Sequence, residues 1–246
     1  MSVPIGSYFL EREQPALSLE EAKVVERFHD LYYRRWSQQG ADTINLSWFG
    51  YETLKCPLDL WIYQELLVAT RPDIVIETGT WFGGSALYIA MLLEQIGDGQ
   101  IITIDVEVKP NRPEHRRIKY LTGSSTDQAI VAQVTSLVGG KRSMIILDSD
   151  HRASFVYDEL IAYSPLVQVG DYIIVEDTNV NGHPAWPDFG PGPTEALQKF
   201  LAENNEFIID RCCERFLMTL NPGGYLRRNG AGITSSKDTE RVDKTA

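Results

Sequence analysis

The chain is poor in the features that mark several classes of protein. It has three cysteines, Cys56 and the adjacent Cys212 and Cys213, and their number and spacing fit neither a disulfide framework nor a zinc site. No apolar run approaches the roughly 20 residues that span a membrane, and the N-terminus lacks the basic and then apolar order of a secretory signal. These absences predict a soluble protein of the reducing cytoplasm.

Basic residues are in the minority. Lys and Arg number 23 against 34 Asp and Glu, so the formal net charge is -11. This balance argues against a nucleic-acid partner, because phosphate binding depends on clustered basic side chains. The dinucleotide pattern G-x-G-x-x-G is absent, and so is the nucleotide-binding loop that ends in Gly-Lys-Ser/Thr. We therefore expect a small-molecule partner, and neither nucleic acid nor a membrane.

Three stretches of different composition predict the organisation of the chain. Residues 1–70 carry charged, aromatic-rich helical patterns, such as Leu19 to Trp36 after an N-cap at Ser18, and predict an N-terminal helical cap segment. Residues 71–226 alternate short apolar runs with helical patterns, which predicts an α/β domain with a mostly parallel sheet. Residues 227–246 are polar and predict a loosely held tail.

The middle stretch contains the candidate strands and helices. Its best-defined helix runs from Gly84 to Ile96, and Gly97 should end it. Only a few residues separate the last two candidate strands, which predicts an antiparallel hairpin at one edge of the sheet. The candidate strands are Ile74–Glu77, Ile101–Asp105, Ile118–Leu121, Met144–Leu147, Tyr172–Val175, Phe207–Cys212 and Phe216–Leu220.

Two acidic clusters each follow an apolar run. Asp148 and Asp150 follow one run, and Glu176 and Asp177 follow the next. If these runs are neighbouring parallel strands about 4.8 Å apart, the acids converge where open α/β sheets bind ligands. Because two unpaired carboxylates about 4 Å apart repel by roughly 4 kcal/mol, we expect a hard cation, Mg²⁺, between them. Each cluster alone is equally consistent with the N-cap of a helix.

A glycine-bearing turn follows the first run of the sheet. It reads E-x-G-x-x-x-G-G from Glu77 to Gly84. Gly79 lets the backbone turn sharply and approach a ligand, and Gly83 lets the next helix begin close to the sheet. Glu77 would repel a pyrophosphate and would favour the ammonium and sulfonium groups of S-adenosylmethionine. The turn therefore indicates a methyl donor rather than a nicotinamide.

Two later turns complete the predicted donor site. Asp105 ends the second run and can accept both hydroxyls of an adenosine ribose. Ser124 and Ser125 belong to a small polar turn that suits the edge of an adenine. The order of these signals over three successive strands favours a nucleoside-binding sheet.

Five motifs stand out between about Trp48 and Arg228. They are Lys55-x-Pro57-x-Asp59-Leu60-Trp61-x-Tyr63-Gln64-Glu65, Ile76-Glu77-Thr78-Gly79-Thr80-x-x-Gly83-Gly84-Ser85, Leu147-Asp148-Ser149-Asp150-His151, Val175-Glu176-Asp177-Thr178-Asn179-Val180-Asn181-Gly182-His183-Pro184 and Pro187-Asp188-Phe189-Gly190-Pro191-Gly192-Pro193. At these motifs the chain resembles the cephalosporin hydroxylase-like, or rhamnosyl O-methyltransferase-like, family of class I S-adenosylmethionine-dependent methyltransferases.

The resemblance implies a seven-stranded, mostly parallel Rossmann-like sheet with two bound cofactors. It implies Mg²⁺ held by Asp148, Glu176 and Asp177, with Asp150 as the alternative to Asp148 or as a residue that orients a histidine. The implied donor-binding residues are Glu77, Gly79, Thr80, Gly83, Ser85, Asp105, Ser124, Ser125 and Asp148.

Two histidines are candidates for the general base. His151 and His183 both follow the acidic strand ends, and imidazole titrates nearest to neutral pH. His29 and His115 have no such context. The stretch from Asn179 to Pro193 is long and rich in Pro and Gly, which predicts a lid over the site or a rigid surface loop.

Together these observations predict a Mg²⁺-dependent O-methyltransferase that acts on a hydroxyl of a small natural product or sugar. Two alternatives are an NAD(P)-dependent oxidoreductase on the same fold, which Glu77 and the glycine spacing disfavour, and a non-catalytic module that binds S-adenosylmethionine. The aromatic N-terminal region is a candidate contact surface for a homo-oligomer.

Overall fold

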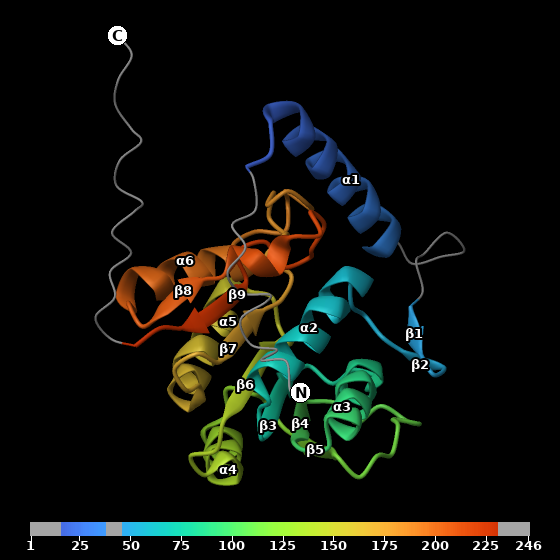
Figure 1. Cartoon of the computed structure of the whole chain (residues 1–246), viewed down its shortest axis with the longest axis vertical. Helices are drawn as coiled ribbons and strands as arrows, with labels where there is room; N and C mark the ends of the chain where they lie inside the picture. The colour runs from blue at the N-terminus through green and yellow to red at the C-terminus, as the bar shows by residue number, and fades with distance from the viewer. Residues whose placement is uncertain (1–15, 38–45, 231–246) are drawn as a thin grey trace, which may run out of the picture.

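The structure is a computed structural model that describes residues 16–37 and 46–230. Within these ranges a seven-stranded sheet lies between helices (Figure 1). Its strands are arranged in the order β5-β4-β3-β6-β7-β9-β8. They are β3 (Ile74–Thr78), β4 (Gln100–Asp105), β5 (Ile118–Thr122), β6 (Ser143–Leu147), β7 (Tyr172–Val175), β8 (Phe207–Ile209) and β9 (Tyr225–Arg228). A separate two-stranded sheet pairs β1 (Ser47–Trp48) with β2 (Tyr51–Glu52).

The central sheet is mostly parallel. The five strands from β5 to β7 run in one direction, and β9 is antiparallel to both of its neighbours, β7 and β8. The predicted α/β fold class is therefore confirmed. Because the chain winds outward from β3 to β5 and then returns to β6, the sheet has a topological switch point between β3 and β6.

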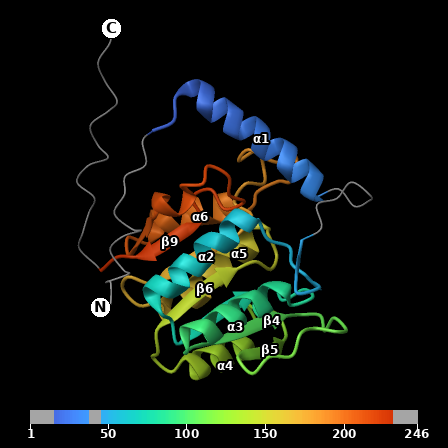
Figure 2. The ribbon, with the colours of Figure 1, turned by 45° about the vertical axis from the view of Figure 1, so that its right-hand side comes forward.

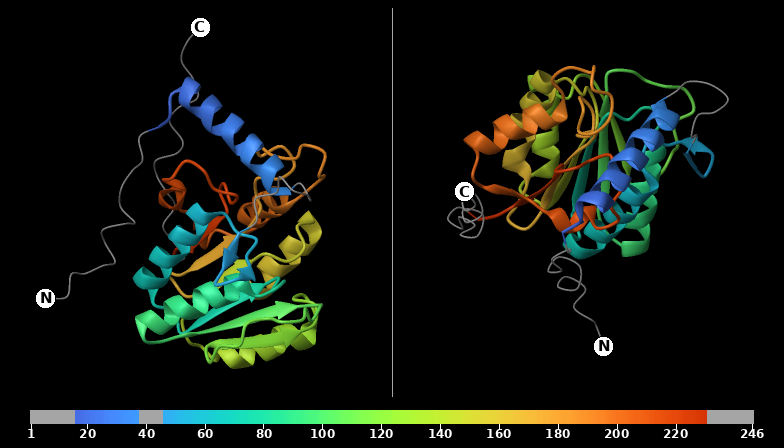
Figure 3. Two further views of the ribbon diagram at one scale, coloured as in Figure 1. Left: turned by 90° about the vertical axis from the view of Figure 1, so that its right-hand side faces the viewer. Right: turned by 90° about the horizontal axis from the view of Figure 1, so that it is seen from above.

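Helices cover both faces of this sheet, because apolar residues on its central strands point to both sides. Alternate residues of β3 show this: Val75 packs toward one face, while Ile74 and Ile76 pack toward the other. One face is covered by α2 and α3, and the other by α4, α5 and α6 (Figures 2 and 3). The helices are α1 (Leu19–Ser37), α2 (Pro57–Thr70), α3 (Gly84–Ile96), α4 (Gln128–Val138), α5 (Ala153–Tyr163) and α6 (Pro193–Glu203), with short 3₁₀ helices at Ser164–Leu166 and Arg211–Glu214.

Two helix ends match the sequence signals that predicted them. The Ser18 hydroxyl accepts a hydrogen bond from the Glu21 amide, and the Glu21 carboxylate accepts one from the Ser18 amide, so the pair forms a capping box at the start of α1. Gly97 has a φ of 95° and its amide donates to the Leu93 carbonyl, which ends α3 in the left-handed conformation.

The helix α1 lies apart from the layered body and contacts it through residues of its second half (Figures 1 and 3). Tyr33 is buried in a small apolar cluster with Val180 and Met218, and His29 is buried as well. By contrast α2, which belongs to the same predicted N-terminal segment, packs directly on the sheet. The predicted tail lies outside the described residues from residue 231 onward, whereas Arg227 and Arg228 belong to β9.

The predicted strand at Phe216–Leu220 is wrong, and so is the short hairpin that would contain it. The chain leaves β8 at Asp210, whose carboxylate accepts from the Cys212 amide and begins a 3₁₀ helix. The Leu220 amide donates to the buried Asp59 carboxylate instead of to a strand. The second edge strand forms only at β9, although the antiparallel pair at the edge of the sheet is present as predicted.

Within the described residues, no helix combines the length and the apolar character that crossing a membrane requires.

Candidate active site

A cleft of about 710 Å³ opens at the carboxyl ends of the parallel strands. It lies over the switch point between β3 and β6, where open α/β sheets bind their ligands. Segments that follow five neighbouring strands, β5, β4, β3, β6 and β7, form most of its wall. The lining residues are Leu54, Gly79, Trp81, Ile104, Asp105, Val106, Glu107, Gly123, Ser124, Ser125, Asp148, Ser149, Asp150, His151, Arg152, Phe155 and Asp177.

The turn after β3 touches the turn after β6 at Gly79. Gly79 has a φ of 84°, and a Cβ added to it would lie 1.9 Å from the backbone oxygen of Asp148. No side chain fits this contact, and the left-handed conformation also favours glycine. Gly79 therefore lets the two turns meet and places the Asp148 backbone at the floor of the cleft.

The carboxylate of Asp105 fixes the next part of the wall. One of its oxygens accepts from the Trp81 amide at 2.8 Å, and the other accepts from the Glu107 amide at 2.9 Å. Arg112 approaches the same carboxylate at 3.4 Å. Asp105 thus holds the glycine turn against the turn after β4, in addition to any contact it makes with a ligand.

Glu159, a buried residue that no sequence motif marked, links the turns after β5 and β6 by hydrogen bonds. The Glu159 carboxylate of α5 is fully buried and accepts hydrogen bonds from the hydroxyls of Ser125, at 2.5 Å, and Ser149, at 2.7 Å. These serines belong to the turns after β5 and β6, and both line the cleft. No motif marked Glu159, because its partners are 34 and 10 residues away.

The acids after β6 and β7 do converge, as predicted. Leu147 pairs with Val175 in the parallel ladder, so the residues that follow them lie side by side. Asp148, His151 and Asp177 each offer a ligand atom, and these atoms all lie within 4.8 Å of one another. The His151 Nε2 atom is 3.2 Å from an oxygen of Asp177. Two carboxylates and an imidazole at this spacing can hold a divalent cation.

The Glu176 carboxylate turns inward from this group. It accepts a hydrogen bond from the Tyr63 hydroxyl at 2.6 Å and forms an ion pair with the ammonium of Lys55. The same ammonium lies 2.5 Å from an oxygen of Asp148. Lys55 therefore bridges the acid after β6 and the first acid after β7 from inside the molecule.

Burial and charge shift the acid equilibria of this cluster. Burial raises the pKa of Asp148 to about 7, although the Lys55 ammonium opposes the shift. Burial and then the neighbouring Asp148 charge raise the pKa of Glu176 well above its ordinary value. For Lys55, burial lowers the pKa, but Asp148 and Glu176 outweigh this effect and raise it. The bare, ionised form of the two carboxyl groups is therefore disfavoured at this site.

Several residues of the predicted donor site lie beneath the cleft wall. Glu77 is fully buried and accepts from the Thr103 hydroxyl at 2.7 Å. The hydroxyls of Thr80 and Thr103 are also 2.7 Å apart, and Ser85 is buried at the start of α3. Gly83, with a φ of 80°, begins that helix where a Cβ would meet Pro113. Of the predicted donor residues, Gly79, Asp105, Ser124, Ser125 and Asp148 line the cleft.

The structure separates the predicted catalytic residues. His151 lines the cleft beside Asp177. Asp150 also lines it, but its carboxylate pairs with Arg152 at the surface, and the hydrogen bond from Arg152 lowers its pKa. His183 is not among the lining residues, and its Nε2 atom lies 2.9 Å from the Glu195 carboxylate of α6.

The loop that follows β7 packs against α1. The Nε2 atom of His29 in α1 lies 3.0 Å from the side-chain Nδ2 atom of Asn179, and burial lowers the pKa of His29 to about 4. Within the loop, the Gly182 amide donates to the Ala185 carbonyl and Trp186 packs edge-on against Phe189. His29, for which no sequence motif indicated a function, thus connects the N-terminal helix to the loop next to the acidic cluster.

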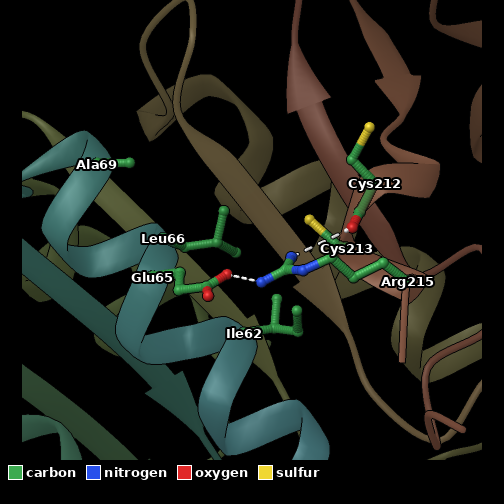
Figure 4. A pocket seen from close by; sticks show the side chains of 7 residues that line it. All are labelled: Ile62, Glu65, Leu66, Ala69, Cys212, Cys213 and Arg215. Atoms are coloured by element: carbon green, nitrogen blue, oxygen red, sulfur yellow. Dashed lines mark hydrogen bonds and ion pairs between the residues drawn. The ribbon is translucent and has the colours of Figure 1, made fainter. Parts of the chain in front are cut away.

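A second hollow, between α2 and the 3₁₀ helix at Arg211–Glu214, is too small for a ligand. Its volume of about 10 Å³ leaves room for one water molecule at most. The Glu65 carboxylate and the Arg215 guanidinium form an ion pair across it, and the sulfurs of Cys212 and Cys213 point in different directions (Figure 4). The cleft at the strand ends, where most of the predicted donor and metal residues meet, is the candidate active site.

Comparisons with known proteins identify the family to which the chain belongs. Residues 41–229 match the model of the family described as rhamnosyl O-methyltransferase/CmcI. The chain belongs to this family. The rhamnosyl O-methyltransferase of Mycobacterium tuberculosis is 39% identical over 216 residues, which cover 84% of this chain and 85% of that protein. The protein of the same name from Mycobacterium leprae is 37% identical over 212 residues, with coverage of 83% and 90%.

Solved structures support the fold. The apo structure of CmcI has a TM-score of 0.59 and 22% sequence identity, and the match covers 90% of this chain and 88% of that chain. The structure of CmcI described as Mg-SAM has the same TM-score of 0.59 with 20% identity, over 89% and 88% of the two chains. The predicted family and class I methyltransferase fold are confirmed. As a member of this family, the chain is an S-adenosylmethionine-dependent O-methyltransferase.

Proposed function

We propose that this methyltransferase requires Mg²⁺ and methylates a hydroxyl of a rhamnosyl or closely related sugar on a small natural product. The observation that carries the proposal is the convergence of Asp148, His151 and Asp177 at the edge of the 710 Å³ cleft. Curated relatives over 84% of the chain are named rhamnosyl O-methyltransferases, which supports the sugar as acceptor.

The cleft fits a nucleoside donor. Its wall joins a glycine whose backbone is open to a ligand, an acidic side chain at the end of β4, and two serines after β5. Its volume lies within the 300–1,000 Å³ that is roughly typical of small-molecule sites. Gly79, Asp105, Ser124 and Ser125 are the residues that we propose hold S-adenosylmethionine.

The acidic cluster fits a hard divalent cation. Asp148 and Asp177 supply the carboxylate oxygens that Mg²⁺ prefers. Glu176, the third acid of the predicted set, contacts Lys55 and Tyr63 and adjoins the cluster from within. We therefore propose Asp148 and Asp177 as ligands that face the cleft, with Glu176 as the inner acid of the centre.

When bound, S-adenosylmethionine supplies an electrophilic methyl group, and Mg²⁺ acts as a Lewis acid that lowers the pKa of a hydroxyl. His151 is the group of this chain that can take the hydroxyl proton, because it lines the cleft beside the proposed ligands. Its Nε2 atom faces Asp177, so Nδ1 is the ring nitrogen that is left to accept the proton. Asp177, at 3.2 Å, orients the ring and stabilises the imidazolium that forms. His183 lies against Glu195 and is the weaker candidate.

The test is methyl transfer from labelled S-adenosylmethionine to a panel of rhamnosides in which single hydroxyls are blocked. Activity should be lost on chelation and restored by Mg²⁺. D177N should lose it as well, whereas D158N, a matched change at an exposed position of α5, should not. Full activity in chelator would remove the metal from the proposal, and transfer to acceptors without a sugar would remove the substrate class.

A further inference from the structure

Lys55 is a lysine in an unusual place. Its side chain is 1% exposed. Lys55 lies just before α2, and it precedes every strand of the seven-stranded sheet in the sequence. Lysine is almost never fully buried unless it is paired. Here the ammonium contacts carboxylates from two strand ends, Asp148 after β6 and Glu176 after β7. The ion pairs span 93 and 121 residues of sequence, so the contact depends on the complete fold.

The Lys55 ammonium partly neutralises the acidic cluster. Asp148, Glu176 and Asp177 carry three carboxylates, and Lys55 offsets one of them. In ionised form the group keeps a formal charge of -2, which one divalent cation cancels. Glu77 is a further buried carboxyl that acts on Lys55, but it hydrogen-bonds to Thr103 and is not one of the groups that offer a ligand atom to the cation.

We propose that Lys55 is the internal counter-ion of the metal centre, which offsets the charges of Asp148 and Glu176 before a cation binds and sets the net charge of the site to match a divalent ion. The proposal rests on the proposed Mg²⁺ site. The geometry assigns Lys55 to the inner side of the carboxylates, while His151 and Asp177 face the cleft. Lys55 is therefore a positioning residue and does not touch the acceptor.

A neutral side chain at position 55 should change how the site binds cations. Even at the dielectric constant of water, removing a unit charge about 5 Å from a divalent ion changes its affinity more than tenfold. K55Q should therefore bind Mg²⁺ at least about tenfold more tightly than the wild type. K55R keeps the charge and should stay within about threefold of the wild type. A lysine with only a packing role would not produce this difference between Gln and Arg.

The experiment is calorimetric titration of the full chain with Mg²⁺ at pH 7.5, together with thermal unfolding with and without the ion. K141Q, at an exposed lysine, is the matched control. Without Mg²⁺, K55Q should unfold at a lower temperature than the wild type, because it leaves the buried Glu176 and the partly buried Asp148 without their cation. Saturating Mg²⁺ should then raise its unfolding temperature by more than that of the wild type.

Each outcome decides between the claims. If the wild type binds Mg²⁺ and K55Q binds it equally or more weakly, the role of Lys55 is overturned and the metal centre stands. If the wild type binds no divalent cation, the metal centre and the role of Lys55 both fail. If K55Q is unfolded without Mg²⁺, recovery of cooperative unfolding with Mg²⁺, but not with NaCl of equal ionic strength, supports the proposal, and no recovery overturns it.

Discussion

The contact between Gly79 and the Asp148 backbone gives a sharp prediction for G79A. A non-glycine residue in the left-handed region costs about 1–2 kcal/mol. The new Cβ would also sit 1.9 Å from the Asp148 oxygen and 2.7 Å from its carbonyl carbon, so two backbone segments must separate. Overpacking of this kind adds about 1–3 kcal/mol. We therefore expect G79A to lose about 2–5 kcal/mol of unfolding free energy.

The chain offers a matched control for the conformational part of this cost. Gly97 has a similar φ of 95°, but a Cβ there meets no atom within 4 Å. G97A should therefore lose only the strain of about 1–2 kcal/mol. Urea unfolding gives both values, and calorimetry with S-adenosylhomocysteine gives the effect on the cleft. G79A should bind the nucleoside at least about tenfold more weakly, equivalent to about 1.4 kcal/mol, while G97A binds normally. Equal stability losses with unchanged binding would refute the backbone contact.

Two further predictions concern histidines on either side of the acidic cluster. H151Q should lower kcat about 10²–10⁴-fold and leave the affinity for S-adenosylhomocysteine within about threefold of the wild type. The control H115Q should change neither quantity. A kcat for H151Q close to that of the wild type would exclude His151 as the base. His29 has its pKa lowered from 6.5 to about 4 by burial, so its neutral form favours folding; this stability is fully present above pH 6.5 and is lost as the pH falls toward 4. The wild type should lose about 1.4 kcal/mol per pH unit in this window relative to H29N, and parallel stability curves in urea titrations from pH 7 to pH 4.5 would contradict the assignment.

The sequence predicted the central sheet well because its strands are local apolar runs. Ile74–Thr78 and Ser143–Leu147 are fully buried from end to end, so each run is read without knowledge of its neighbours. Both ends of the helix Gly84–Ile96 were predicted correctly, because a long apolar stretch marks its length and Gly97 marks its end. The prediction of an edge strand at Phe216–Leu220 was wrong, because the Leu220 amide donates its hydrogen bond to Asp59, a buried acid that is distant in the sequence.

The part of the site that follows from the order of the strands could be predicted from the sequence. Asp148, His151 and Asp177 follow adjacent parallel strands, so their convergence follows from the ladder. The inward turn of Glu176 depends on Lys55, whose place was not readable because 121 residues separate the two. The same holds for Glu159, which sits under the cleft with no local signal.

The measurement closest to the central claim is anomalous scattering from crystals grown with Mn²⁺ and S-adenosylhomocysteine. Mn²⁺ replaces Mg²⁺ at oxygen sites and can be located without bias. We predict one peak in contact with the carboxylates of Asp148 and Asp177, with the nucleoside in the adjoining cleft. A peak elsewhere, or a bound nucleoside with no metal between the ends of β6 and β7, would contradict the account.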